Sequence, residues 1–230
     1  MTYKQGELEF RWCDDIGMFA FDRPIHDIPE EGIEGSCEHK TTYCADHCYN
    51  NKLYKLYPDM YKRDVRNELA WQAVDGVAIK AQLNRKRRST QRIRGCTRGE
   101  NFKDVSDISR WMDILYHNPH TDWWMPTKAW RDPLLYQYIM KCIKPHPNVV
   151  VLASTDLTTH KDDWDGLVYH GWSTMFFGDN DMTHLHDGKA MFKCPKTWKD
   201  NMDGHCDICK AGCFRELTLA DTVHVHLKEH

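Results

Sequence analysis

The chain has 230 residues, enough for one domain with a substantial hydrophobic core. Its 34 acidic and 31 basic residues give a net charge of -3, which excludes a generic polyanion-binding protein. No apolar run approaches the roughly 20 residues of a membrane-spanning helix. The N-terminal MTYKQGELEF is polar and lacks the apolar segment of a secretory signal, so we expect a cytoplasmic protein without membrane contact.

The expected secondary structure is irregular at first and becomes regular along the chain. Turn residues are frequent over 1–36, where no regular element is expected. A short helix broken near Pro58 is expected over 50–61, and a second helix over 64–85, where apolar residues recur at helical spacing. Further motifs predict a strand at 90–95, a helix with an Asp104 or Ser106 cap that ends before Pro119, a strand at 122–128, a helix at 132–144, and strands at 148–156, 167–178 and 189–195.

From Gln91 onward, strands alternate with helices of about 12 residues, which is typical of βαβ units with a parallel sheet. In such sheets, functional side chains gather at the carboxyl ends of the strands. The candidates at these ends are Gly99, Glu100, Thr127, Lys128, Ser154, Thr155 and Asp156.

Three cysteines, Cys37, Cys44 and Cys48, lie close together in the segment SCEHKTTYCADHCYNNK. Clustered cysteines in a reducing compartment are more often metal ligands than disulfides. Three thiolates can hold a 4Fe-4S cluster and leave one iron open to a small molecule such as S-adenosylmethionine. Zinc is the alternative, with His39 or His47 as a fourth ligand.

A second cysteine group has the spacing C-x11-C-x2-C-x3-C and consists of Cys194, Cys206, Cys209 and Cys213. Its C-x2-C core is a chelating hook, so this segment predicts a closed site for zinc or a second 4Fe-4S cluster. His205 could replace one of the cysteines. We therefore expect two parts, 1–193 and a cysteine-rich metal-binding segment at 194–230. The isolated Cys13, Cys96 and Cys142 are expected to be small buried residues.

Three other features have a structural and a functional interpretation. Seven basic residues between Arg85 and Arg98 form either a solvated surface or a contact for a nucleotide or nucleic acid, with Arg92 and Arg94 facing the interior. Tryptophans 123, 124 and 130 are either core residues or a stacking platform for a base. The two His-x-His pairs, 184/186 and 224/226, have a spacing that could bind a metal on a strand, but they are expected to be surface or structural residues.

The order of several motifs is more specific than any one of them. The chain contains SCEHKTTYCADHCYNNK, RIRGCTRGENFKDVSDISRWMDILYHNP, WWMPTKAWRDP, PNVVVLASTD, GWSTMFFGDN and CPKTWKDNMDGHCDICKAGCF in this order. This series, over about residues 35 to 226, resembles the phage "gene product 88"-type family, whose members look like radical S-adenosylmethionine (SAM) proteins. The resemblance implies an α/β fold, a partial (β/α) barrel of the radical SAM type with a cysteine-rich extension. It also implies a location in the host cytoplasm.

The resemblance also implies roles for particular residues. The cluster would be held by Cys37, Cys44 and Cys48, and Gly99 with Glu100 would bind the amino group of the cofactor. Further contacts to cofactor or substrate would come from Lys128, Ser154 and Asp156. Arg94 is a candidate for such a contact on a different ground, its alternation with Ile93 in the basic stretch. Two departures stand out: the usual spacing is C-x3-C-x2-C, and the second strand here reads RGCTRGE.

The expected function is that of an iron–sulfur protein resembling radical SAM enzymes, with a nucleotide or nucleic acid as the substrate class. No catalytic residue is assigned. The alternative is a non-catalytic binding protein, stabilised by zinc or iron–sulfur, that contacts nucleic acid or a host factor.

Overall fold

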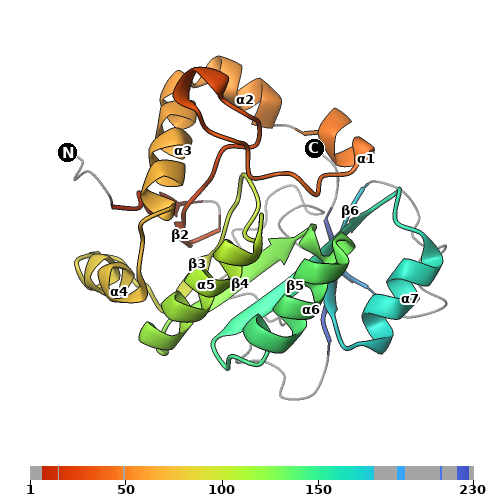
Figure 1. The fold of residues 1–230 in the computed structure, drawn as a ribbon. Coiled ribbons are helices and arrows are strands. Elements are labelled where there is room, and N and C mark those ends of the chain that lie inside the picture. Colours follow the sequence, from red (N-terminus) through yellow and green to blue (C-terminus); the bar gives the residue numbers. More distant parts are fainter. Residues whose placement is uncertain are drawn as a thin grey trace.

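The computed structural model describes residues 7–14, 16–48, 50–178, 191–194, 213 and 222–227. These residues form an α/β fold around a sheet with the strand order β1-β2-β3-β4-β5-β6-β8-β7 (Figure 1). The first two strands pair antiparallel, and every other neighbouring pair is parallel. The mostly parallel α/β class expected from the sequence is therefore confirmed.

The elements are short at both ends of the described chain and longer in its middle. The strands are β1 (Arg11–Cys13), β2 (Met18–Ala20), β3 (Arg92–Arg94), β4 (Asp122–Thr127), β5 (Val149–Asp156), β6 (Ser173–Phe177), β7 (Phe192–Lys193) and β8 (His224–Leu227). The helices are α1 (Thr42–Asp46), α2 (Asn50–Leu56), α3 (Pro58–Trp71), α4 (Gly76–Asn84), α5 (Val105–His117), α6 (Pro133–Tyr138) and α7 (Lys161–Tyr169). Two 3-10 turns (Pro29–Glu31 and Ala129–Arg131) and a π-helical turn (Ile139–Ile143) complete the set.

Strands β2 to β6 follow one another in chain order across the sheet. Right-handed crossovers between consecutive parallel strands place the connecting helices on the same face. Accordingly, α5 and α6 lie side by side over β4 and β5 in Figure 1. The opposite face of the sheet is left for other contacts, and the candidate site lies there.

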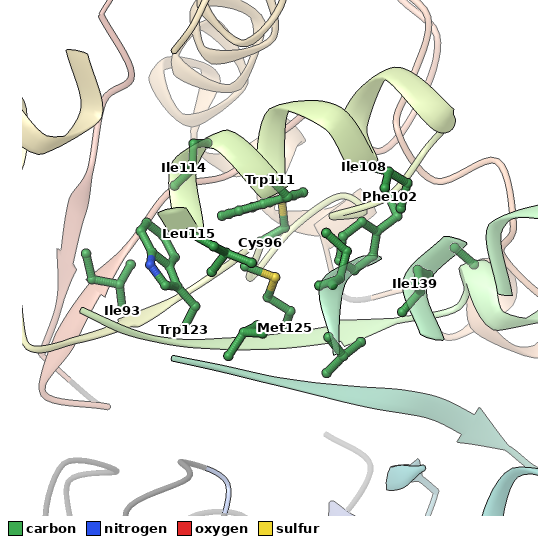
Figure 2. Close-up of a cluster of buried hydrophobic side chains, with 14 of the residues drawn as sticks. Ile93, Cys96, Phe102, Ile108, Trp111, Ile114, Leu115, Trp123, Met125 and Ile139 are labelled. Atoms are coloured by element: carbon green, nitrogen blue, oxygen red, sulfur yellow. The ribbon is translucent and has the colours of Figure 1, made fainter. Parts of the chain in front are cut away.

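The main core lies between the sheet and the helices. Trp111 of α5 packs on Trp123 of β4, with ring centroids 5.2 Å apart, and both side chains are fully buried. Figure 2 shows the apolar side chains of α5 above Ile93 and Met125 from the strands. Because successive strand residues point to opposite faces, Trp124 faces away from this core. It packs with Met175 in a second cluster on the other side of the sheet.

Several predicted elements are confirmed, including β3, β4, β5 and the helix capped by Asp104, whose carboxylate accepts a hydrogen bond from the backbone N–H of Asp107. The single helix predicted over 64–85 is wrong, because the chain forms α3 and α4 there. Asp75 caps the start of α4 by accepting from the N–H of Ala78. Gly76 permits a close approach to α5, since a Cβ at this position would clash with the backbone of Asp113.

Other differences concern the two ends. The stretch expected to be irregular contains β1 and β2, and α7 occupies part of the segment expected to be a strand at 167–178. Strand β8 inserts between β6 and β7, so residues 224–227 of the expected C-terminal segment belong to the same sheet. The division at residue 194 stays a prediction. Within the described residues, no helix has the length and apolar character to cross a membrane.

Candidate metal and cofactor pocket

A pocket of about 380 Å³ lies on the face of the sheet opposite to α5 and α6, at the carboxyl edge of the strands. Its volume is in the range of small-molecule sites, roughly 300 to 1,000 Å³. Many candidate residues from the sequence line this pocket. They include Cys37, Cys44, Cys48, Arg94, Gly99, Glu100, Trp124, Thr127, Lys128, Ser154 and Cys194. The fold thus brings residues from distant parts of the sequence to one place.

The cysteine loop is fixed to the sheet through Thr41. The Thr41 hydroxyl accepts a hydrogen bond from the backbone N–H of Cys44 at 3.0 Å and donates to the Asp156 carboxylate at 2.6 Å. Burial by itself would raise the pKa of Asp156, but hydrogen bonds from Thr158 and Thr41 bring it below its usual value. Asp156 was predicted to contact a cofactor; the structure places it as the anchor of the loop that carries Cys44.

Two of the loop thiols, Cys37 and Cys44, have raised pKa values. Burial raises the pKa of Cys37 to about 12, and the nearby Glu100 carboxylate and Cys44 add to the rise. Burial also raises the pKa of Cys44, whereas the Lys128 cation opposes the effect. Without a metal these two thiols stay protonated near neutral pH, so a bound metal has to displace their protons.

The thiols share the pocket without forming a preassembled site. Within the described part of the chain, no set of three or more His, Cys, Asp or Glu side chains is gathered closely enough to hold a metal ion. The donor set suits either an iron–sulfur cluster or zinc, because both bind cysteine thiolates. Of the two histidines considered as a fourth ligand, His47 lines the pocket, while His39 Nε2 donates to the backbone carbonyl of Lys103.

Gly99 is required by its surroundings. Its φ of +81° is in the left-handed region, which glycine adopts without strain. A Cβ at this position would lie 2.5 Å from the Ser36 Oγ and 2.6 Å from the backbone oxygen of Arg23. The Ser36 hydroxyl in turn accepts a hydrogen bond from the backbone N–H of Glu100. The glycine therefore lets the loop after β3 pack against the segment that leads into the cysteine loop.

The Glu100 carboxylate is buried and holds backbone amides. It accepts hydrogen bonds from the N–H groups of Asn101 at 2.7 Å, Phe102 at 3.3 Å and Lys128 at 2.8 Å. Burial raises the pKa of Glu100, against the opposing effect of these bonds. Since a carboxylate has about four acceptor sites, the three amides leave little capacity for the cofactor amino group that Glu100 was predicted to bind.

Two half-buried cations also line the pocket. Lys128 Nζ donates to the Ser154 hydroxyl at 2.8 Å, and the Arg94 guanidinium lies over the Trp124 ring at 4.7 Å. Neither cation forms an ion pair with a described residue. The Arg94 Nε is buried without a hydrogen-bond partner. The pocket therefore offers positive charge at these two positions, in addition to the exposed Lys40 and the carboxylate-paired Arg98 in its lining.

Cys194 and Cys96 extend the cysteine set beyond the sequence prediction. Cys194 was assigned to the second cysteine group, yet it lines the same pocket as the first, and its backbone N–H donates to the carbonyl of His226 in β8. Cys96 is buried as expected and also lines the pocket. Cys213 packs against the second apolar cluster, on the pocket side of the sheet. The structure does not describe Cys206, Cys209 or His205.

The remaining candidates lie outside the pocket. In the basic stretch, Arg85 pairs with Glu7 at 2.8 Å and Arg88 pairs with Asp14 at 3.3 Å. Part of this charge is therefore neutralised locally. On β8, the His224 ring contacts the Trp164 ring in a tilted arrangement with centroids 5.4 Å apart, and His226 Nε2 donates to the Gly178 carbonyl at 2.6 Å. These histidines have structural contacts, while the pair 184/186 lies outside the described residues.

The fold and the pocket define an α/β protein with a cysteine-lined cavity at the carboxyl edge of a parallel sheet. The family model described as "Gene product 88" matches residues 16–211, and the chain therefore belongs to this phage protein family. No curated protein and no solved structure matches the chain.

Proposed function

We propose that the protein is an iron–sulfur protein of the radical SAM kind, with a 4Fe-4S cluster at Cys37, Cys44 and Cys48. The observation that carries the proposal is the pocket itself. The three cysteines lie in one cavity with Gly99, Glu100, Lys128 and Ser154, which the family resemblance singles out as cofactor or substrate residues, and with Arg94.

The arrangement of the sheet supports a partial (β/α) barrel. Strands β2 to β6 run parallel in chain order, with α5 and α6 together on one face and the pocket on the other. A barrel has the same order, with helices outside and the active site at the carboxyl ends of the strands. The cysteine loop follows β2, the first strand of the parallel part of the sheet.

A bound cluster and S-adenosylmethionine would supply the one-electron cleavage of a carbon–sulfur bond. The chain's own residues have supporting tasks. Lys128 favours the thiolate forms of Cys37 and Cys44 by its positive charge. Glu100 fixes the backbone of Lys128, and Met175 and Phe177 give the pocket an apolar wall. The protein would act in the host cytoplasm.

A second candidate function follows from Cys194. With Cys37, Cys44 and Cys48 it gives four half-buried thiols around the pocket, beside the fully buried Cys96, and four thiols suit a closed zinc site or a closed cluster. The protein would then be a non-catalytic binding protein stabilised by its metal. The proposed second metal, zinc or a 4Fe-4S cluster at the C-terminal cysteines, fits either function.

The test is anaerobic purification followed by analysis of iron, sulfide and zinc. The proposal expects about four irons with matching sulfide at the loop. It also expects release of 5′-deoxyadenosine when S-adenosylmethionine and a strong reductant are added. Cys44→Ala should lose the loop cluster, and Cys142→Ala, a change on the helix-covered side, should keep it. Zinc without sulfide in the wild-type protein would overturn the proposal in favour of the binding protein.

A further inference from the structure

We propose that Arg94 anchors the anionic group of the substrate, a small molecule that carries a phosphate or a carboxylate. The inference rests on the proposed function only in treating the pocket as a substrate site. It adds two points to that function: the substrate carries a negative charge, and Arg94 binds the charged group.

The first argument comes from a comparison of Arg94 with two fully buried arginines, Arg23 and Arg98. Arg23 pairs with Glu68 at 2.7 Å and Asp107 at 2.6 Å, and Arg98 pairs with Asp22 at 2.7 Å and Asp64 at 2.8 Å. Each of these structural arginines is neutralised by two carboxylates, as expected for a buried charge.

Arg94 departs from this pattern although it is half-buried. It makes no ion pair with a described residue, and its Nε is buried without a hydrogen-bond partner. Its guanidinium instead lies over the Trp124 ring, with Cζ 4.7 Å from the ring centroid. A cation–π contact of this kind positions the guanidinium without using up its N–H donors, which can still bind an anion. An anionic ligand would therefore give Arg94 the negative partner that carboxylates give to Arg23 and Arg98.

The second argument is the position of Arg94 in the pocket. Arg94 pairs in register with Trp124 on β4, and Lys128 follows four residues later. At about 3.3 Å per strand residue, the two cations are separated by roughly 13 Å along the strand direction. Lys128 lies near the loop cysteines, and its positive charge favours the thiolates that would bind the metal. Arg94 lies at the other position, over Trp124, which packs in one apolar cluster with Met175 of the pocket lining.

The chemistry of guanidinium selects the ligand class. Its planar fork binds phosphate and carboxylate groups through two parallel N–H bonds. The apolar residues around it, Trp124, Pro126 and Met175, suit a ligand with an apolar or ring-shaped body. A nucleoside monophosphate and an aromatic carboxylate both meet this description, and the experiment separates them.

The experiment compares the wild-type protein with Arg94→Gln and Arg92→Gln. Arg92 is the matched control, since it is half-buried on the same strand but does not line the pocket. Binding of adenosine monophosphate, adenosine, inorganic phosphate and benzoate is measured by titration calorimetry at constant ionic strength. Binding of an anionic probe should weaken about tenfold or more in Arg94→Gln and stay unchanged in Arg92→Gln.

The pattern among the probes identifies the source of the anion. Binding by the monophosphate but not by benzoate assigns a phosphate, and the reverse assigns a carboxylate. Either pattern supports Arg94 as the anchor when the binding weakens in Arg94→Gln and not in Arg92→Gln. Equal affinities of Arg94→Gln and the wild-type protein, or no binding of any anionic probe to the wild-type protein, would overturn the inference.

A second readout needs no ligand. Arg94→Met removes a cation without an ionic partner, so its unfolding temperature should equal or exceed that of the wild type. Arg98→Met, which breaks a paired site, should unfold at a clearly lower temperature. Equal losses in both variants would mean that Arg94 is structural. Iron content should not change in Arg94→Gln, which keeps this test independent of the metal analysis.

Discussion

The carboxylate of Glu100 accepts a hydrogen bond at 2.8 Å from the backbone N–H of Lys128, and this bond ties the loop after β3 to the end of β4. The same carboxylate holds the amides of Asn101 and Phe102. The acidic residue that resembles a cofactor ligand in the sequence thus acts first as a brace. It sets the position of Lys128 relative to the cysteine loop.

Replacement of Glu100 by glutamine should therefore destabilise the protein. The glutamine amide has one acceptor oxygen, and its NH2 group would face a backbone donor. We expect the free energy of unfolding to fall by about 1–3 kcal/mol, the range for bonds to a charged acceptor. Urea denaturation of Glu100→Gln measures this change. The exposed Glu38→Gln should stay within about 0.5 kcal/mol of the wild type; equal stability of both variants would contradict the bracing role.

Gly99 should be the least replaceable glycine near the pocket. Gly99→Ala combines a positive φ with a Cβ that meets Ser36 and the Arg23 backbone, so we expect a loss of about 1–3 kcal/mol. Gly166→Ala is the control, because a Cβ in the middle of α7 meets no atom within 4 Å. It should raise stability by about 0.5–1 kcal/mol. Thermal unfolding of both variants checks the prediction, and a neutral Gly99→Ala would refute it.

The buried ion pair between Asp22 and Arg98 should make stability depend on pH. Burial alone would raise the pKa of Asp22, but Arg98 and Arg11 lower it below the usual 3.8. The stabilisation from an acid with a lowered pKa is present above the unfolded value and disappears as pH falls through the folded value. Asp22→Asn should therefore cost about 3–5 kcal/mol at neutral pH, and less as pH falls below about 3.8.

The control for Asp22 is Asp59→Asn, whose carboxylate is 99% exposed in its contact with Lys62. It should change stability little at any pH. Urea denaturation of the three proteins over a pH series gives the comparison. A difference between the wild type and Asp22→Asn that stays constant down to strongly acidic pH would contradict a lowered pKa.

The sequence predicted the parts of the fold that depend on local signals. Strand β5 is a run of buried β-branched and small residues, and α5 has an Asp104 cap and apolar residues at helical spacing. By contrast, β1 and β2 have three residues each, too few for an alternating pattern to be visible. The break between α3 and α4 depends on the capping by Asp75 and on the contact of Gly76 with α5, which is a tertiary effect.

Much of the candidate site also depends on non-local contacts. Residues after the carboxyl ends of strands were correctly expected near one another, since parallel strands share an edge. The hydrogen bond from Thr41 to Asp156 joins segments far apart in the chain, and no local sequence pattern predicts it. The position of Cys194 follows from the pairing of β7 with β8, and spacing alone had grouped this residue with a separate site.

The position of Cys194 gives the prediction that separates the two functions proposed for the pocket. In the radical SAM proposal the loop cysteines hold the cluster and one iron stays open. Cys194→Ala should then retain about four irons at the loop, whereas Cys44→Ala should lose them. Iron and sulfide are measured on anaerobically purified proteins, with Cys142→Ala as the control for a cysteine on the helix-covered face. Loss of the loop iron in Cys194→Ala, equal to the loss in Cys44→Ala, would contradict the open iron. Four thiolates would then close the site, and the metal would serve to hold the cysteine loop against β7 and β8.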